Sequence, residues 1–461
     1  MIPLRLDEVA AAVGGRLVDV PDPAAVVNGT VEFDSRAVTA GGLFVALPGE
    51  RVDGHDFAAR AVRGGAVAVL AARPVGVPAV VVDDPLVALS ALAAEVLRRL
   101  PDLTIIGITG SVGKTTTKDF TAALLRRVGA TVAPPESFNN EIGHPHTALK
   151  ADAQTRFLVL ENSARRIGHI AALCAVAPPR IGAVLNVGSA HVGEFGSRAA
   201  IAQAKGELIE ALPAEGVAIL NADDPLVAAM RPRTQARVVT TGTAADADFR
   251  AVDIRLDGSG HPSYVLLARG EKTPVTLASV GEHQVPASLA AIAIAAEVGL
   301  PLTEAAEVLR VTGPASRWRM EVTTRPDGVT IVNDAYNANP ESMAAALRAV
   351  AAISTGRRVW AVLGVMAELG ADTVAAHAEA GRLAAELGVD RLVVVGAQAR
   401  PLHEAAVAEP GWRGESVVVP DVRAAIELVT TQVITGDIVL VKASHAEALE
   451  RVALALLGDQ Q

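Results

Sequence analysis

A glycine-rich loop between an apolar strand and a helix carries the residues best suited to phosphate chemistry. Residues 107–116 read GITGSVGKTT. Glycines let backbone N–H groups approach phosphate oxygens, and the following helix N-terminus adds partial positive charge. Lys114 can bridge the outer phosphates and the Thr115 hydroxyl can ligate Mg²⁺. The loop therefore predicts a nucleoside triphosphate site made by Thr109, Gly110, Ser111, Gly113, Lys114, Thr115 and Thr116.

The elements around this loop predict an alternating α/β fold. A buried-type strand, 103–108, precedes the loop, and a helix begins near Lys114. Apolar strands and helices then alternate along the chain, which is typical of mostly parallel sheets. A polar β meander is expected over 248–280, and a further doubly wound block follows Pro314. We expect three domains, 1–100, 101–312 and 313–461.

Composition bounds the class of protein. With 461 residues, 51% hydrophobic and 20% charged, the chain predicts several globular domains. The net charge of −10 disfavours a nucleic-acid binder, because such proteins usually present a basic face. The longest weakly charged stretch, 285–296, is too short to span a bilayer, so we expect a cytoplasmic protein. Cys174 is the only cysteine, so any metal should be oxygen-bound.

Lysine is rare in this chain and is therefore informative. Only six of the 41 basic residues are lysines, among them Lys114 and Lys205. A lysine supplies a compact point charge or a titratable amine, which a guanidinium cannot. Chance retention remains the alternative for any one of them.

Several motifs in order resemble the Mur ligase family of ATP-dependent amide-forming enzymes. Ile108 replaces the first glycine of the common phosphate-loop pattern, leaving the T-G-x-x-G-K-[ST] form, and residues 137–143 read SFNNEIG. The stretches 34–36, 42–47 and 53–57 are similar to an N-terminal UDP-sugar module, and 334–340 (DAYNANP) to the start of the C-terminal domain.

The resemblance implies a three-domain fold and a reaction. The fold has a small N-terminal α/β domain that binds a UDP-linked substrate, a central ATP-binding parallel-sheet domain and a C-terminal Rossmann-like domain for the amino substrate. The branch it resembles adds D-alanyl-D-alanine to UDP-N-acetylmuramoyl-tripeptide in peptidoglycan precursor synthesis, using ATP and Mg²⁺. We expect a monomer with no nucleic-acid or membrane partner.

Elementary chemistry agrees with such a reaction. Joining a carboxylate to an amine at neutral pH requires an activated acyl group, so ATP would phosphorylate the carboxylate and the amine would attack the acyl phosphate. The transferred phosphoryl group carries concentrated negative charge, so cations are the main catalytic requirement.

The resemblance also implies roles for individual residues. Glu161 would ligate Mg²⁺, His191 a second metal, and Lys205 would act as a carbamate facing metal, beside Thr115. A solvated carboxylate, a capping histidine and an exposed lysine are the plain alternatives. Arg319, or its neighbour Arg317, would reach the ATP phosphates from the C-terminal domain. Asp334, Tyr336 and Asn337 would contact the nucleotide, and the expected substrate contacts are Ser35, Arg36, Asn139, Asn140, Asn339 and His445.

Four positions depart from the family pattern. Ala287 stands where an asparagine is usual, Val365 where an acidic residue is usual, and Asn162 where an apolar residue is usual. His445 replaces an arginine expected near the acceptor carboxylate, and histidine is only partly charged at pH 7. Two alternatives therefore stay open: a related ligase with another acceptor, such as D-alanyl-D-lactate or a specialised-metabolite amine, and a nucleotide-binding protein without catalysis.

Overall fold

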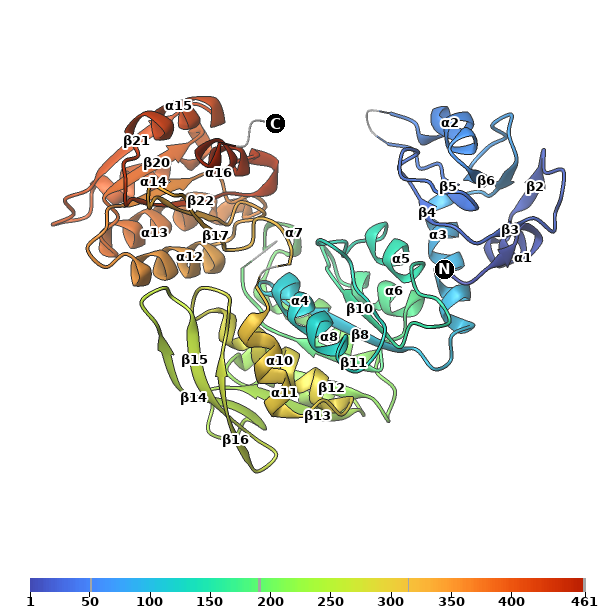
Figure 1. The fold of residues 1–461 in the computed structure, drawn as a ribbon, viewed down its shortest axis with the longest axis horizontal. Helices are drawn as coiled ribbons and strands as arrows, with labels where there is room; N and C mark the ends of the chain where they lie inside the picture. The colour runs from blue at the N-terminus through green and yellow to red at the C-terminus, as the bar shows by residue number, and fades with distance from the viewer. Residues whose placement is uncertain (50–51, 190–191, 314, 459–461) are drawn as a thin grey trace.

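The protein is described by a computed structural model that covers residues 1–49, 52–189, 192–313 and 315–458. It has three α/β domains (Figure 1). In this view the N-terminal domain, in blue, and the C-terminal domain, in orange and red, lie on opposite sides of the central domain. Among the described residues, no helix has the length and apolar composition needed to traverse a bilayer.

The N-terminal domain is a small sheet with one long helix against it. Its five strands run in the order β2-β7-β6-β5-β4, and a separate pair is formed by β1 and β3. The strands are β1 (Leu4–Arg5), β2 (Arg16–Val18), β3 (Val26–Val27), β4 (Val31–Glu32), β5 (Gly42–Val45), β6 (Ala66–Ala71) and β7 (Ala79–Val81), and the helices are α1 (Leu6–Val13), η1 (Gly54–Phe57), α2 (Ala58–Arg63) and α3 (Pro85–Arg98).

Helix α3 joins this domain to the next one. Asp84 caps its N-terminus by accepting the N–H groups of Leu86 and Val87, and Pro85 occupies the first turn. Its buried Leu89, Leu92 and Val96 belong to an apolar cluster that also contains central-domain side chains. The helix is thus packed against both domains.

The central domain is a nine-stranded sheet in the order β16-β15-β14-β13-β12-β11-β8-β10-β9. The strands from β9 to β14 in this order are parallel, and β14, β15 and β16 form the expected antiparallel meander. The strands are β8 (Thr104–Thr109), β9 (Thr131–Val132), β10 (Phe157–Glu161), β11 (Ile181–Val184), β12 (Val217–Asn221), β13 (Arg237–Gly242), β14 (Phe249–Leu256), β15 (Pro262–Ala268) and β16 (Glu271–Thr276).

Helices cover both faces of this sheet. The helices are α4 (Lys114–Leu125), α5 (Gly143–Ala148), α6 (His169–Val176), α7 (Val192–Phe195), α8 (Arg198–Glu210), α9 (Pro225–Ala228), η2 (Arg231–Arg233), α10 (Gln284–Glu297) and α11 (Leu302–Val311). One apolar cluster joins α4, α10 and α11 to one face, and another joins α6 and α8 to the opposite face. From central strand β8 the chain passes to β9 and then β10 on one side and crosses to β11 on the other side, and ligands bind at such a switch point in open α/β sheets.

The C-terminal domain is a doubly wound sheet in the order β17-β18-β22-β19-β20-β21. Only the edge strand β17 is antiparallel to its neighbour. The strands are β17 (Glu321–Thr324), β18 (Thr330–Asn333), β19 (Val359–Leu363), β20 (Arg391–Val395), β21 (Glu415–Val419) and β22 (Ile438–Lys442), and the helices are α12 (Pro340–Ile353), η3 (Gly370–Asp372), α13 (Thr373–Glu386), η4 (Ala397–Ala399), α14 (Arg400–Val407), α15 (Val422–Gln432), η5 (His445–Glu447) and α16 (Glu450–Leu457).

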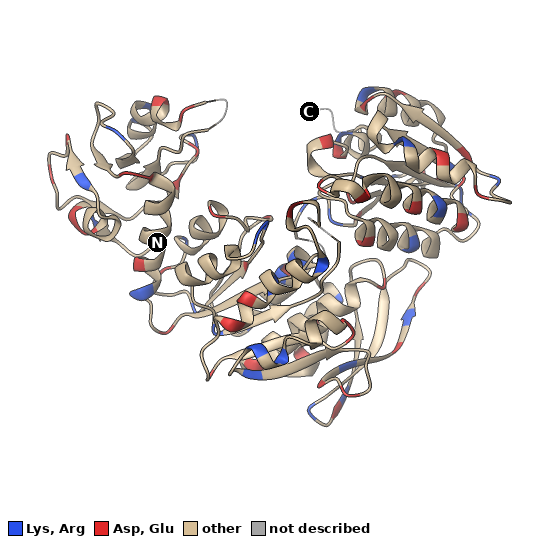
Figure 2. Ribbon diagram, turned by 180° about the vertical axis from the view of Figure 1, so that it is seen from behind, with Lys and Arg blue, Asp and Glu red and all other residues tan. Residues whose placement is uncertain are grey.

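Charges of both signs are spread over all three domains rather than gathered on one basic face (Figure 2). An anionic substrate must therefore meet a local concentration of cations, and the carboxyl ends of the two larger sheets supply it.

Candidate active site

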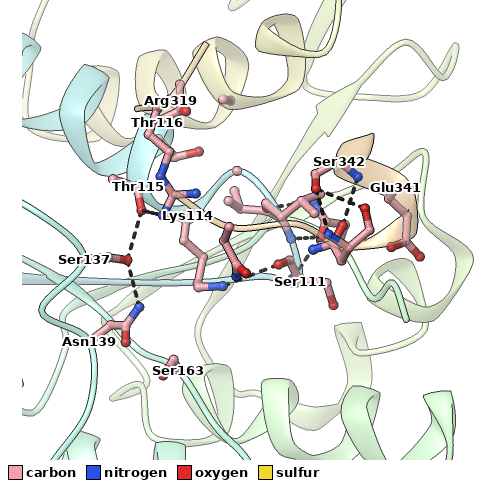
Figure 3. A pocket seen from close by; sticks show the side chains of 18 of the residues that line it. Ser111, Lys114, Thr115, Thr116, Ser137, Asn139, Ser163, Arg319, Glu341 and Ser342 are labelled. Carbon is pink, nitrogen blue, oxygen red and sulfur yellow. Dashed lines mark hydrogen bonds between the residues drawn. The ribbon is translucent and has the colours of Figure 1, made fainter. Parts of the chain in front are cut away.

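A cavity of about 840 Å³ lies where the central and C-terminal domains meet. The phosphate loop and the ends of β12 and β13 form one side, and residues that follow β18 and β22 form the other. Figure 3 shows side chains from both domains converging on it. The cavity is therefore built from the carboxyl ends of two parallel sheets, which is where such sheets hold their ligands.

Asn186 fixes the shape of the phosphate loop. Its side-chain oxygen accepts the N–H groups of Ser111 and Val112, both at 2.9 Å, and its amide donates to the Val112 carbonyl at 3.1 Å. Gly113 has a φ of +81°, which a glycine adopts without strain, and it turns the chain into α4. The first turn of α4 leaves the N–H groups of Lys114 to Thr116 without intrahelical acceptors. These donors are suited to phosphate oxygens.

The Lys114 side chain folds back onto the phosphate loop. Its Nζ donates to the Gly110 carbonyl at 2.7 Å. Burial lowers its pKa to about 8; Glu161 opposes this shift and Arg319 adds to it. The amine therefore loses its charge as the pH rises through this pKa, and a phosphate that binds beside it would favour the charged form.

Hydrogen bonds join Thr115, Ser137 and Asn139 (Figure 3), and all three side chains also contact Glu161. The Thr115 hydroxyl lies 3.2 Å from Ser137 Oγ and donates to Glu161 Oε2 at 3.3 Å. Ser137 and the Asn139 amide also donate to Glu161 Oε2, at 3.2 and 3.3 Å. The Glu161 side chain is fully buried, and Oε1 has no hydrogen-bond partner in the described part of the chain. A buried carboxylate oxygen without a partner is costly, and a cation would compensate for it.

Arg319 reaches this chain from the C-terminal domain. Its Nη2 donates to Thr115 Oγ1 at 3.2 Å, and its guanidinium lies 4.1 Å from the centre of the Tyr336 ring. The flanking residues Trp318 and Met320 have φ values of +58° and +50°. Bulky residues rarely adopt such values, and strained backbone is concentrated at functional sites. The backbone is therefore bent sharply on both sides of the arginine.

Asp334 and Lys442 form a buried ion pair behind Arg319. Lys442 Nζ lies 2.6 Å from Asp334 Oδ2 and also donates to the Asn337 carbonyl at 2.8 Å. Asp334 Oδ1 accepts the N–H of Met320 at 3.0 Å. Burial lowers the pKa of Lys442, while the Asp334 charge acts in the opposite direction. The pair thus holds the backbone next to Arg319.

A second contact between the domains lies at Glu341, in the first turn of α12. Its carboxylate accepts the N–H of Ser189 at 2.7 Å and the hydroxyl of Ser189 at 3.0 Å. Nearby, the N–H of Gly193 donates to the Glu368 carbonyl at 3.3 Å. The loop after β11 is therefore tied to the C-terminal domain.

Lys205 is buried in α8. Loss of solvation lowers its pKa well below the usual value, and the Lys114 charge adds to the effect. No acceptor in the described residues is hydrogen-bonded to its amine. Such a lysine holds a larger neutral fraction at a given pH, and the neutral amine is the form that adds CO₂.

Comparisons with known proteins agree with this geometry. Three family models match the chain: the Mur ligase middle domain over residues 108–295, the Mur ligase, glutamate ligase domain over 318–445, and the Mur ligase family, catalytic domain over 29–99. A protein of Mycobacterium leprae named UDP-N-acetylmuramoyl-tripeptide–D-alanyl-D-alanine ligase is 50% identical over 100% of this chain and 99% of its own length.

The chain belongs to the Mur ligase family. A protein of the same printed name from Escherichia coli is 35% identical, with 99% of each chain covered. Among solved structures, MurF from Acinetobacter baumannii matches with a TM-score of 0.87 at 28% identity, covering 99% of each chain. MurF from Thermotoga maritima in complex with ADP matches with a TM-score of 0.81 at 30% identity, covering 94% of this chain and 98% of its own. This Mur ligase is an ATP-dependent enzyme that forms amide bonds.

The cavity of this Mur ligase gathers most of the residues singled out from the sequence. It is lined by Ser111, Gly113, Lys114, Thr115, Thr116, Asn139, Asn140, Arg319, Asp334, Tyr336, Asn337 and Asn339. Glu161 lies behind Thr115, and Asn339 also caps α12 by accepting the N–H of Ser342 at 2.9 Å. Thr109, Gly110, Lys205 and His445 are not part of the lining, and Arg317 is exposed.

Two expected residues lie in another domain. Ser35 and Arg36 belong to the N-terminal domain and do not line the cavity, and the Arg36 guanidinium is paired with Asp34 at 2.7 Å. His191 lies outside the described residues. In the part of the chain that is described, no three His, Cys, Asp or Glu side chains gather as a ready metal site.

The four departures from the family pattern lie in different surroundings. Ala287 lines the cavity, and Val365 is buried, with its carbonyl accepting the N–H of Ser444 at 2.9 Å. Asn162 is buried, with its amide 3.9 Å from the Cys174 sulfur. His445 is exposed, and its ring stacks on Tyr336 with centroids 5.3 Å apart.

The site residues that were absent from the sequence prediction include Ser137, Asn186, Glu341 and Lys442. Ser137 stands in a motif that carried the resemblance, and Lys442 is one of the rare lysines. Lysine rarity could have indicated Lys442. Nothing in the sequence distinguishes Glu341 from other first-turn glutamates, because its partner is 152 residues away.

Asn186→Ala should weaken nucleotide binding. It removes the three hydrogen bonds through which Asn186 shapes the loop, each of which contributes about 1 kcal/mol, and the Kd for ADP should rise at least roughly 10-fold, since about 1.4 kcal/mol corresponds to a factor of ten. Isothermal titration calorimetry would measure it. Asn28→Ala, which removes an exposed asparagine of the N-terminal domain, is the control. An unchanged Kd for Asn186→Ala would show that Asn186 does not hold the loop in a binding shape.

Nucleotide affinity should depend on the charge of Lys114. Its lowered pKa means that the amine is charged below about pH 8 and loses its proton as the pH rises through that value. The Kd for ADP should therefore be constant below this pH and rise above it. Lys114→Arg, whose guanidinium stays charged, should lose the pH slope even if its affinity is lower. A wild-type Kd that is flat across this range would contradict the assignment.

Proposed function

We propose that this Mur ligase joins D-alanyl-D-alanine to UDP-N-acetylmuramoyl-tripeptide and converts ATP to ADP and phosphate. The observation that carries the proposal is the 50% identity, over the whole chain, to the Mycobacterium leprae protein that bears this activity in its name. The cavity agrees with it, because a phosphate loop on one domain faces Arg319 on the other. The product belongs to peptidoglycan precursor synthesis.

The reaction proceeds in two balanced steps. A carboxylate oxygen of the tripeptide attacks the γ-phosphorus of ATP, the bond to the β-phosphate oxygen breaks, and ADP leaves. The amine of the dipeptide, having lost one proton to solvent, then attacks the acyl carbon. The carbon–oxygen bond breaks, phosphate leaves, and the nitrogen gives up its second proton as the amide forms.

The chain's own residues supply positive charge and hydrogen-bond donors to the first step. Lys114 and the N–H groups of the first turn of α4 are placed to hold the phosphates of ATP. Arg319 lies beside Thr115 and can offset charge that develops on the transferred group. The buried Asp334–Lys442 pair supports the backbone next to Arg319.

The residues around Thr115 fit a magnesium ion. Thr115 Oγ1, Ser137 Oγ and Glu161 Oε2 are hard oxygen donors within 3.3 Å of one another, and Glu161 Oε1 is buried without a partner among the described residues. Thr115 and Glu161 would hold the ion together with phosphate oxygens. Bound Mg²⁺ supplies positive charge that neutralises the phosphate oxygens.

A second metal position would involve His191 and a carbamate on Lys205. The amine of Lys205 is buried and its pKa is lowered, so a larger share of it is uncharged, and this supports the role. A carbamate replaces a cation by an anion, which also removes the repulsion between Lys205 and Lys114.

The domains would divide the substrates among themselves. Residues 1–100 bind the UDP portion through Ser35 and Arg36, residues 101–312 bind ATP, and residues 313–461 bind the dipeptide. Asn139, Asn140, Asn339 and His445 contact the peptide parts of the substrates. We propose a monomer in the cytoplasm, because ATP and UDP-linked precursors are made there.

A ligase with another acceptor is the second candidate, and His445 is the observation that favours it. The ring stacks on Tyr336, with centroids 5.3 Å apart, and is tilted against Trp318, with centroids 6.0 Å apart. A histidine cannot bind an acceptor carboxylate through two parallel N–H groups as the planar guanidinium of an arginine does. The intact phosphate loop and the family membership leave no support for a protein without catalysis.

An acceptor panel tests the proposal. The purified protein is mixed with ATP, Mg²⁺ and UDP-N-acetylmuramoyl-tripeptide, and phosphate release is measured with D-alanyl-D-alanine, D-alanyl-D-lactate or other amines. We expect D-alanyl-D-alanine to give the highest kcat/KM and mass spectrometry to detect the amide product. A higher kcat/KM for another acceptor would replace the first candidate by the second.

Lys205→Gln tests the carbamate. Turnover should fall roughly 100-fold, a loss expected when a group that orients a metal is removed, whereas ADP affinity should change little. Carbon-13 NMR of protein equilibrated with labelled bicarbonate should give a carbamate signal in the wild type and none in the variant. Lys272→Gln, which removes an exposed lysine of β16, is the matched control. Undiminished turnover in Lys205→Gln would remove the carbamate from the mechanism.

A further inference from the structure

A buried polar cluster lies beside the phosphate loop, on the face of α4 that carries Thr115. Lys118 is fully buried, Asp119 is 9% exposed and Ser316, in the segment that enters the C-terminal domain, is 4% exposed. Residues 115, 118 and 119 share one helix face, because positions three and four apart are neighbours on a helix. The cluster therefore lies on the same surface of α4 as the Thr115 hydroxyl.

The cluster ties three segments together. Lys118 Nζ donates to the Pro134 carbonyl at 2.8 Å and to Ser316 Oγ at 3.2 Å, and it is paired with Asp119 Oδ1 at 2.6 Å. Asp119 Oδ2 accepts the N–H of Ser316 at 3.0 Å. The Ser316 hydroxyl also lies 3.4 Å from the Pro135 carbonyl. Helix α4, the segment at 134–135 and the segment at 316 thus meet at one ammonium group.

In each of the two segments that Lys118 binds, a residue of the site follows three positions later in the chain. Ser137 follows Pro134 and contacts Thr115 and Glu161. Arg319 follows Ser316 and contacts Thr115. Three residues span at most about 11 Å even when fully extended, and the bent backbone at Trp318 and Met320 shortens that reach. The position of Ser316 therefore restricts where Arg319 can lie.

We propose that Lys118 and Asp119 are positioning residues that set Arg319 and Ser137 around the Thr115 hydroxyl. The ammonium fits because its three N–H donors meet three acceptors, the Pro134 carbonyl, Ser316 Oγ and Asp119 Oδ1. A guanidinium is planar and too large to converge on these three atoms. This accounts for a buried lysine in a chain whose cations are mainly arginines.

The pair acts on the C-terminal domain as well as on the loop. Ser316 precedes that domain, and its N–H and hydroxyl are both held by α4 residues. Placement of Arg319 is thereby coupled to the helix that begins at the phosphate loop. The inference rests on the proposed function, because ligase turnover is one of its measurements.

The test variant replaces both partners, Lys118→Met with Asp119→Asn, so that no uncompensated charge is buried. The kcat for phosphate release should fall on the order of 100-fold, the cost of misplacing a reacting or stabilising group by about 1 Å. The Kd for ADP should change little, because the loop and the start of α4 are intact. The matched control is Arg310→Met with Glu307→Gln, an exposed pair on α11 that removes the same charges.

A double-mutant cycle with Arg319→Ala separates positioning from general destabilisation. If the pair acts through Arg319, adding Lys118→Met and Asp119→Asn to Arg319→Ala should lower kcat by much less than it does in the wild type. The proposal would be overturned if the two substitutions lowered kcat by the same factor in Arg319→Ala as in the wild type. An equal loss of kcat in the Arg310/Glu307 control would overturn it as well.

A measurement without turnover keeps this inference distinct from the proposed function. Trp318 lies between Ser316 and Arg319, and its fluorescence is obtained as the difference between each protein and its Trp318→Phe counterpart. Acrylamide quenching of Trp318 should increase when Lys118 and Asp119 are replaced and stay unchanged in the control. Unchanged quenching in the test variant would overturn the positioning role. A wild type without acceptor-dependent turnover would instead contradict the proposed function.

Discussion

Two cations from different domains lie close together at this site. Lys114 enters from the phosphate loop and Arg319 from the C-terminal domain, and the buried Glu161 carboxylate accepts the Thr115 hydroxyl to which Arg319 also donates. The Arg319 charge contributes to the lowered pKa of Lys114, whereas Glu161 raises it. A triphosphate would supply the negative charge that this arrangement lacks. Electrostatic attraction between phosphate and both domains is therefore the interaction on which the assembled site depends.

The same constraint explains how an acidic protein binds anionic substrates. The chain carries a net charge of −10, and its charges are interspersed over the three domains. A local site succeeds because the first turn of α4, Lys114 and Arg319 act at short range, where a low dielectric strengthens them. Repulsion between the acidic surface and an anionic substrate is then weak, because salt screens it over long distances.

The sequence allowed a close prediction of the elements that hold the phosphate site. Helix α4 begins at Lys114, as expected, because a glycine loop precedes it, and β14 to β16 form the expected meander. Strand β11 ends at Val184. The reason is that Asn186 is used to hold the loop rather than to extend the ladder.

Contacts between distant segments could not be predicted in the same way. Arg319 and Thr115 are 204 residues apart, and their hydrogen bond depends on how two domains pack. The roles of Ser137 and of the Lys118–Asp119 pair depend on the same packing. Residue type indicated which side chains could do chemistry, but only the three-dimensional structure determines their partners.

The four departures from the family pattern bear on the surroundings of His445 more than on the phosphate loop. Among the described residues, the hydrogen bond from these four positions to residues 107–116 is the one from the backbone N–H of Asn162 to the Ile108 carbonyl at 2.8 Å, which does not depend on residue type, so the phosphoryl-transfer groups are unaltered. His445, however, stacks on Tyr336, and Tyr336 in turn lies under the Arg319 guanidinium at 4.1 Å. A change at position 445 can therefore reach the phosphate side through the Tyr336 ring. If His445 recognises the acceptor as proposed, one stack of side chains would join acceptor recognition to phosphoryl transfer, and an acceptor that displaced His445 would also alter the support of Arg319.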